Sequence, residues 1–169
     1  MRVEAFEAHI ELDGATRLMG TGQVLSRGGR TTRAEFVYAD SYLAAPGMPS
    51  LDPATPLDDA RHVGPQLPRG LADAGPDGWG RRLILRAQRG HAPSEAELLL
   101  AVDDLTRIGA LRFRREAAGP FLATGHEVPS LVGVEELAAA AAAVEDDADD
   151  LAAVRVLVDA GTASLGGVR

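Results

Sequence analysis

The clearest hydrophobic periodicity in the chain predicts a helix over residues 78–88. Trp79, Leu83 and Ala87 recur every four residues, which places them on one face of a helix. Asp77 stands just before this run, where a side-chain carboxylate can cap the first turn. Because Trp79 is the only tryptophan and lies on the apolar face, we expect it to anchor the core between a helix pair and a sheet.

A second helix is predicted over residues 95–105, because Ser94 and Glu97 form the S-x-x-E pattern of a capping box. The apolar residues behind this box again share one helical face: Leu98, Leu99, Val102 and Leu105. We expect this helix to pack beside the first. The apolar residues that follow it, ending at Phe113, predict a short strand returning beneath the pair.

The first forty residues predict three antiparallel strands. Residues 3–12 and 17–25 flank Asp13-Gly14, which is a strong hairpin signal. Gly28-Gly29 supplies the next turn, before a strand that ends near Tyr38. Two glycines inside the second strand, at positions 20 and 22, weaken it or mark a bulge.

Residues 46–76 contain seven prolines and no sustained periodicity, which predicts an extended connector. A loop of this length inside a compact domain covers a sheet edge or carries function, so we expect it to wrap the sheet. The alternative interpretation is a flexible linker between two separate domains.

Two further helices are expected over residues 134–144 and 151–160, where alanine-rich and apolar positions follow acidic first turns. The predicted fold is therefore α+β: a small antiparallel N-terminal sheet packed by a helix pair, followed by C-terminal helices that end at a glycine-rich loop. We divide the chain into an α+β domain at 1–125 and a helical extension at 126–169.

Composition excludes several kinds of chemistry. The chain has no cysteine and no lysine, so all 17 of its basic side chains are arginine. Disulfides, thiolate metal sites, Schiff bases and a phosphate-anchoring lysine are therefore excluded. The sequence contains no apolar run long enough to cross a membrane, and the N-terminus has acids where a signal peptide is apolar, so we expect a cytoplasmic protein.

The negative charge is concentrated at the C-terminal end. Residues 116–169 carry 10 acids against 2 arginines, whereas residues 1–115 are balanced. This distribution repels phosphate backbones. The predicted helix at 95–105 also lacks basic groups to read base edges, which excludes direct DNA recognition by the helix pair. The acidic segment is interpreted as a solvated helix surface, or alternatively as a face for a basic partner.

Metal and acid–base candidates are few. We expect no metal site, because the four histidines are isolated from one another, at His9, His62, His91 and His126. Asp103 and Asp104 are adjacent carboxylates that could suggest a general base. Adjacent acids at a helix end more often bind arginine or face water, and Arg107 and Arg112 are the natural partners.

A glycine-rich segment closes the chain: Gly161, Thr162, Ala163, Ser164, Leu165, Gly166 and Gly167. It is not a Walker loop, because Gly167 occupies the lysine position. It is not a nucleophile elbow, because Thr162 occupies the place of the first glycine. A backbone cradle for phosphates requires no particular side chain and stays open, beside the alternative of a plain C-terminal tail.

Three segments, in this order, resemble HipA-family proteins: PDGWGRRL at residues 76–83, LTRIGALRF at 105–113 and GTASLGGVR at 161–169. The resemblance covers the N-terminal part of that family. It implies the N-terminal region of a serine/threonine kinase toxin that transfers phosphate from ATP, with Mg²⁺, to a protein, an aminoacyl-tRNA synthetase in known members. A HipB-like helix-turn-helix antitoxin is the implied partner.

The same resemblance gives the glycine-rich segment its role. Residues 161–167 become the nucleotide-binding loop, and Ser164 becomes the position at which such kinases phosphorylate themselves to move the loop out of its nucleotide-binding form. The catalytic aspartate, metal ligands and nucleotide lysine of the family lie beyond Arg169, so no catalytic residue is assigned here, and a C-terminal kinase core is a further expected partner. The alternative is a stand-alone, noncatalytic module that binds a separate kinase core or an antitoxin.

Overall fold

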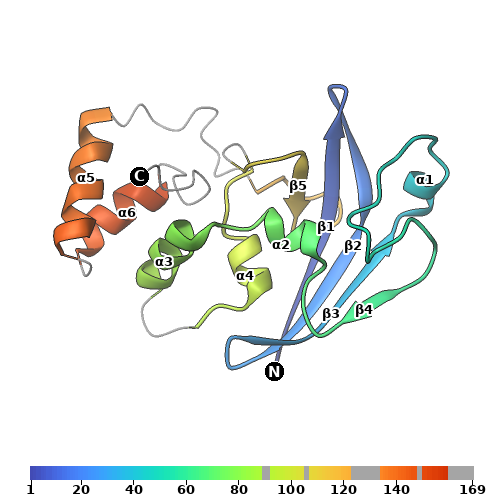
Figure 1. The fold of residues 1–169 in the computed structure, drawn as a ribbon, viewed down its shortest axis with the longest axis horizontal. Coiled ribbons are helices and arrows are strands. Elements are labelled where there is room, and N and C mark those ends of the chain that lie inside the picture. Colours follow the sequence, from blue (N-terminus) through green and yellow to red (C-terminus); the bar gives the residue numbers. More distant parts are fainter. Residues whose placement is uncertain (89–91, 105–106, 123–133, 148–149, 160–169) are drawn as a thin grey trace.

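An antiparallel sheet forms one layer of the molecule. The computed structural model describes residues 1–88, 92–104, 107–122, 134–147 and 150–159. Within these residues the sheet has five strands in the order β4-β3-β2-β1-β5 (Figure 1). The strands are β1 (Arg2–Leu12), β2 (Ala15–Arg27), β3 (Arg30–Tyr38), β4 (His62–Gly64) and β5 (Leu111–Arg114). The predicted α+β class and the antiparallel N-terminal sheet are confirmed.

Both hairpin turns follow from local backbone chemistry. Asp13 and Gly14 have φ values of 51° and 72°, and Gly28 and Gly29 have φ values of 56° and 75°. Two successive residues in the left-handed region make the turn whose twist matches that of the flanking strands. The predictions at these two positions are confirmed.

The glycines inside β2 make room for aromatic rings. A Cβ atom on Gly22 would overlap the ring of Phe6, and one on Gly20 would lie 2.7 Å from the ring of Phe36. The register of β1 and β2 also shifts beside Gly20, so that buried Met19 has no direct partner on β1. The predicted bulge is therefore present, and the glycines allow the core aromatics to pack against the sheet.

Six helices lie within the described residues: α1 (Asp40–Leu43), α2 (Arg69–Asp73), α3 (Gly78–Ala87), α4 (Glu95–Leu99), α5 (Val134–Asp146) and α6 (Leu151–Asp159). They share two main hydrophobic clusters. The larger one joins the sheet to α1, α2 and α4, and the smaller one joins α3 to α5 and α6. Figure 1 shows this order, with α2 and α4 next to the sheet and α5 and α6 beyond α3.

The proline-rich connector wraps the sheet. Its residues 62–64 form β4 on the edge of β3, and its Leu67 and Leu71 are buried in the larger cluster. The Tyr38 hydroxyl donates a hydrogen bond to the Thr55 carbonyl at 2.8 Å and accepts one from the Leu51 N–H at 2.7 Å. The wrapping prediction is confirmed, and the alternative of a flexible interdomain linker is wrong.

The helix predicted over 95–105 is shorter than expected. The Ser94 capping box forms as predicted, but α4 ends at Leu99. Beyond this point the carbonyls of Leu99 and Val102 accept hydrogen bonds from the Arg107 side chain at 3.0 and 2.8 Å. The Arg107 side chain thus satisfies carbonyls that a further helical turn would have paired.

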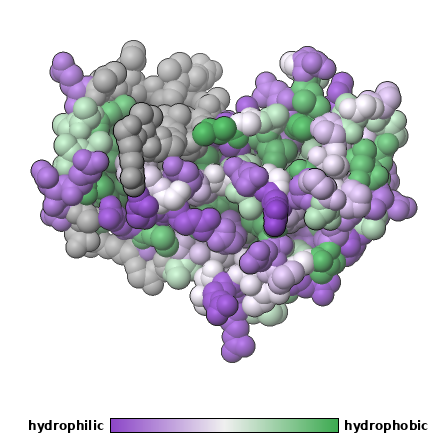
Figure 2. Space-filling model, viewed as in Figure 1, coloured by the Kyte–Doolittle hydropathy of each residue, from purple (hydrophilic) through white to green (hydrophobic). Residues whose placement is uncertain are grey.

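Figure 2 shows hydrophilic and apolar residues interspersed over the face in view. Among the helices of the described ranges, none combines the length and the apolar character that crossing a membrane would require.

Candidate functional site

The sequence-predicted nucleotide loop, Gly161 to Gly167 with Ser164, lies outside the described residues. The structure describes α6, which ends at Asp159, shortly before this segment. The structure does show the contacts that hold α6, the helix that precedes the predicted loop.

The helix α6 is held by the helix that carries the PDGWGRRL segment. Val154 and Leu157 on α6 are buried in the same cluster as Leu83 of α3, together with Ala140 and Val144 of α5. Burial of this shared apolar surface favours a fixed position of α6 on α3.

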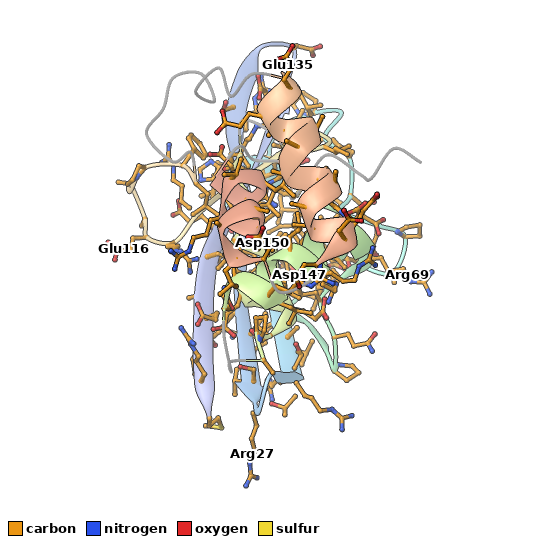
Figure 3. The ribbon with its side chains drawn as sticks, turned by 90° about the vertical axis from the view of Figure 1, so that its left-hand side faces the viewer. Arg27, Arg69, Glu116, Glu135, Asp147 and Asp150 are labelled. Atoms are coloured by element: carbon orange, nitrogen blue, oxygen red, sulfur yellow. The ribbon has the colours of Figure 1, made fainter. Side chains whose placement is uncertain are left out.

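The start of α6 is also capped. The Asp150 carboxylate accepts hydrogen bonds from the N–H groups of Ala152 and Ala153 at 3.0 and 3.1 Å. Figure 3 shows Asp147 and Asp150 where the chain passes between α5 and α6, with Glu135 at the far end of α5. The acidic segment thus supplies a helix cap at this position.

Trp79 does not lie between the helix pair and the sheet, and that prediction is wrong. Its partly buried side chain packs against the α3–α5–α6 cluster. The physical reason is that α4, through Ala96 and Leu99, already covers the sheet. The apolar face of α3 is therefore available to the C-terminal helices.

The contact between α3 and α4 is small and specific. Ile84 and Leu98 form a separate buried pair. Beside them Arg81 donates two hydrogen bonds to the Glu95 carboxylate, at 2.7 and 3.0 Å. These bonds lower the pKa of Glu95 below its ordinary value. The predicted packing of the second helix beside the first is confirmed, through this limited surface.

A buried ion pair lies behind the LTRIGALRF segment. Arg107 donates to the Asp104 carboxylate at 2.7 Å and to the Ala74 carbonyl at 2.6 Å, besides its bonds to Leu99 and Val102. Its guanidinium also lies 4.5 Å from the centre of the Phe113 ring. Burial lowers the pKa of Arg107, while Asp104 acts in the opposite direction.

Asp104 completes this network on the sheet side. Its second oxygen accepts hydrogen bonds from the N–H groups of Phe113 and Leu122, both at 3.0 Å. We call Asp104 and Arg107 the buried pair. It connects the end of α2, the end of α4 and strand β5, so its role is to hold the layers together.

The expected partners of the adjacent carboxylates are only half correct. Asp104 binds Arg107 as predicted, but Arg112 pairs with Glu11 of β1 at 3.2 Å. Arg112 belongs to β5, which pairs antiparallel with β1, so its side chain is carried toward that strand. Gly109, with φ of 91°, provides the turn between the buried pair and β5.

The sheet face opposite the helices carries a pocket of about 380 Å³. Its lining includes Glu7, Thr21, Gln23 and Glu35 from β1, β2 and β3, and Arg61 from the connector. Arg33 and Arg61 each donate to the Glu35 carboxylate at 2.6 Å. The bond from Arg61 is the main cause that lowers the pKa of Glu35, and burial opposes it.

The histidines of the described part do not form a metal site. On β1 His9 contacts Glu7 at 3.1 Å, and on β4 His62 contacts Asp58 of the connector at 3.1 Å. His91 and His126 lie outside the described residues. Among the residues that the structure describes, no three histidine, aspartate or glutamate side chains are grouped to hold a metal ion.

Sequence reasoning expected Arg107 beside the adjacent aspartates, but it missed the carbonyl partners of Arg107 and strand β4. The carbonyls of Leu99 and Val102 lie near Arg107 in sequence, whereas the Ala74 carbonyl lies 33 residues away. The three-residue strand β4 carried no signal, because it is short and lies in the proline-rich connector.

The geometry defines an α+β module. Its sheet packs against α1, α2 and α4, and helix α3, which carries the PDGWGRRL segment, packs against α5 and α6 in a second cluster. The family model for the HipA N-terminal domain matches residues 17–114. This match spans more than half of the chain, which therefore belongs to the HipA N-terminal domain family. No curated protein and no solved structure matches the chain.

Proposed function

We propose that this chain is the N-terminal region of a HipA-like serine/threonine protein kinase toxin of a bacterial toxin–antitoxin system, acting in the cytoplasm. The observation that carries the proposal is the packing of α6 on α3. The helix α3 lies inside the family match, and α6 leads toward the glycine-rich segment. The N-terminal domain would thereby position the nucleotide loop at residues 161–167.

The chain alone is proposed not to transfer phosphate. It contains no lysine to contact a nucleotide phosphate, and the described residues group no three acids or histidines for Mg²⁺. These residues do not fit an ATP–Mg²⁺ centre by themselves, so we assign that chemistry to a C-terminal kinase core. A HipB-like antitoxin remains the proposed protein partner, and nucleic acid contact is assigned to that antitoxin.

The proposal is tested by joining the chain to its core. The genomic sequence after codon 169 is read, the continuous protein is produced, and transfer of labelled phosphate from ATP and Mg²⁺ to a protein substrate is measured. We expect transfer by the joined protein and none by the 169-residue chain. Reproducible transfer by the purified chain, lost on mutation of one of its own residues, would refute the assignment.

Ser164 is proposed to regulate the joined kinase. A phosphoserine adds about −1.5 to −2 charges and would compete with ATP phosphates for the same backbone N–H groups. Phosphosite mapping after incubation with ATP should find Ser164 modified. An unmodified Ser164, together with unchanged activity and nucleotide affinity in the Ser164→Ala variant, would remove it from the mechanism.

A second candidate function is a stand-alone, noncatalytic module that binds a separate kinase core or an antitoxin. The larger hydrophobic cluster favours it, because its buried residues run from Phe6 to Phe113 and need no part of α5 or α6. The mass of the protein isolated from its native cell distinguishes the two. A mass equal to that of the 169-residue chain supports the module, and a larger mass supports the kinase.

A further inference from the structure

Helix α3 lies between the two main hydrophobic clusters. Its Leu83 is buried with Val154 and Leu157 of α6, whereas α4 contributes Ala96 and Leu99 to the cluster of the sheet. Figure 1 shows α3 with α4 on one side and α5 and α6 on the other. We call α3, α5 and α6 the helical cluster. The contact between α3 and α4 joins this cluster to the sheet.

The backbone that enters the helical cluster from the sheet is short. Ala74 is buried in the larger cluster, and its carbonyl accepts the hydrogen bond from Arg107 at 2.6 Å. Asp77 already belongs to the next helix, because its carboxylate accepts an N–H from the first turn of α3 at 2.7 Å. Residues 75–76 lie between these two anchored positions. A few residues at the end of an element can absorb a change in backbone angle, so this link keeps α3 near the sheet without fixing its direction.

Within the described residues, α3 meets α4 through contacts of two kinds. Ile84 and Leu98 are each 3% exposed and form an apolar pair. Arg81 donates from both terminal nitrogens to the two carboxylate oxygens of Glu95, at 2.7 and 3.0 Å. Apolar burial is not directional, whereas two parallel hydrogen bonds between a guanidinium and a carboxylate are. The apolar pair can therefore serve as a pivot, and the ion pair fixes the angle about it.

The ion pair can be broken without unfolding its surroundings. The side chains of Arg81 and Glu95 are 37% and 42% exposed, and an ion pair at this exposure contributes little to stability. The capping box at Ser94 and the buried residues of both clusters do not depend on it. Its loss should therefore change the orientation of the helical cluster before it unfolds either cluster.

We propose that Arg81 and Glu95 are positioning residues that set the orientation of the helical cluster relative to the sheet. Their effect on nucleotide binding rests on the proposed function, because α6 leads toward the loop at residues 161–167. In the joined kinase the ion pair would set the direction in which α6 presents that loop.

The absence of cysteine makes this orientation measurable. Gln23→Cys on β2 and Arg155→Cys on α6 replace exposed residues, and both cysteines are labelled with nitroxides in the full chain. Pulsed electron paramagnetic resonance then gives the distance between the sheet and the helical cluster. We expect one narrow distance distribution when the ion pair is intact. Arg81→Gln and Glu95→Gln should each shift and broaden this distribution.

Three further variants separate the geometry of the ion pair from its charge. Arg81→Lys keeps the positive charge but cannot donate two parallel hydrogen bonds, so it should also shift the distance. The exchange of Arg81→Glu with Glu95→Arg restores an ion pair and should bring the distance back toward its original value. Arg112→Gln is the matched control, because it removes a partly exposed ion pair inside the sheet and should leave the distance unchanged.

A second pair of labels reports whether the helical cluster stays folded. Ala139→Cys on α5 and Arg155→Cys on α6 measure a distance inside the cluster, and Arg81→Gln should leave it unchanged. High salt screens exposed ion pairs. In the chain that keeps Arg81 and Glu95, salt should therefore shift the distance between the sheet and α6 and leave the distance inside the cluster unchanged.

Two results would overturn the proposal. An unchanged distance between the sheet and α6 in both Arg81→Gln and Glu95→Gln would mean that other contacts set the orientation. A change inside the helical cluster in the same variants would give the ion pair a role in folding instead.

The connection to the nucleotide loop is tested separately in the joined protein. Arg81→Gln should weaken ATP binding, and Arg112→Gln should not. A shifted distance with unchanged ATP affinity would remove this connection. If the unmodified joined protein binds no ATP, the proposed function fails, while the distances still decide whether Arg81 and Glu95 orient the helical cluster.

Discussion

Replacement of Arg107 by methionine tests whether the buried pair holds the layers of the fold together. The Arg107 side chain is 0% exposed, and its nitrogens serve Asp104 and the carbonyls of residues 74, 99 and 102. Methionine keeps most of the side-chain length but none of the donors. The variant therefore leaves a buried carboxylate without its cation, and three carbonyls lose a charged donor.

The expected loss of stability is about 3–5 kcal/mol, the range for removing one partner of a buried ion pair. The carbonyls contribute to this loss, since an unsatisfied buried acceptor costs about 1–3 kcal/mol. A small domain has a total stability of about 5–15 kcal/mol, so the variant should be marginally folded. Urea unfolding followed by far-ultraviolet circular dichroism measures the difference.

Two further variants serve as controls for this measurement. Arg112→Met removes an arginine of the same sequence segment whose pair with Glu11 is partly exposed, so it should cost less than about 1 kcal/mol. Adding Asp104→Asn to Arg107→Met removes the unpaired charge and should recover part of the loss. If the free energy of unfolding of Arg107→Met lies within about 1 kcal/mol of that of the unmodified chain, the buried pair does not hold the layers together.

Three other variants probe separate parts of the structure. Trp79→Ala should cost less than the roughly 3–5 kcal/mol of a fully buried aromatic residue, because its ring is only partly buried, and urea unfolding measures this. Glu35 has a lowered pKa in the folded state. Its contribution to stability is therefore present above its unfolded pKa and is lost as the pH falls through its folded pKa. Glu35→Gln removes this contribution, so the free energy of unfolding of the variant should fall less steeply at acid pH. Gly22→Ala should destabilise by about 1–3 kcal/mol, because the new methyl group overlaps the ring of Phe6, and a thermal melt showing no loss would contradict that packing.

The features that the sequence predicted well are those decided by neighbouring residues. The turns at Asp13-Gly14 and Gly28-Gly29 follow from backbone conformations that few residues adopt. The caps at Asp77 and Ser94 follow from a side-chain oxygen that reaches N–H groups three residues on. No distant contact was needed to infer any of them.

The features that sequence reasoning missed depend on contacts between distant segments. Arg107 binds the Ala74 carbonyl 33 residues away, and Trp79 packs on helices that begin more than fifty residues later. Periodicity identified the apolar face of α3, but it could not indicate which element would cover that face. Of the candidate site, the sequence predicted the glycine-rich segment, which lies outside the described residues, and the packing of α6 on α3 emerged only from the structure.

Residues 76–83 and 107–113, the described parts of two of the segments that resemble the family, have structural roles. Their presence therefore indicates the fold and does not by itself indicate kinase activity. In residues 76–83, Asp77 caps α3 and Leu83 is buried against α6. In residues 105–113, Arg107 closes the buried pair and Phe113 packs in the main core. A chain can therefore carry both segments, and fold as this one does, without any phosphate chemistry. The first segment packs α3 against α6, and the second joins α2, α4 and β5. If the joined protein is a kinase, its N-terminal region acts by holding the nucleotide loop in place, and variants of Leu83 should weaken ATP binding through that position.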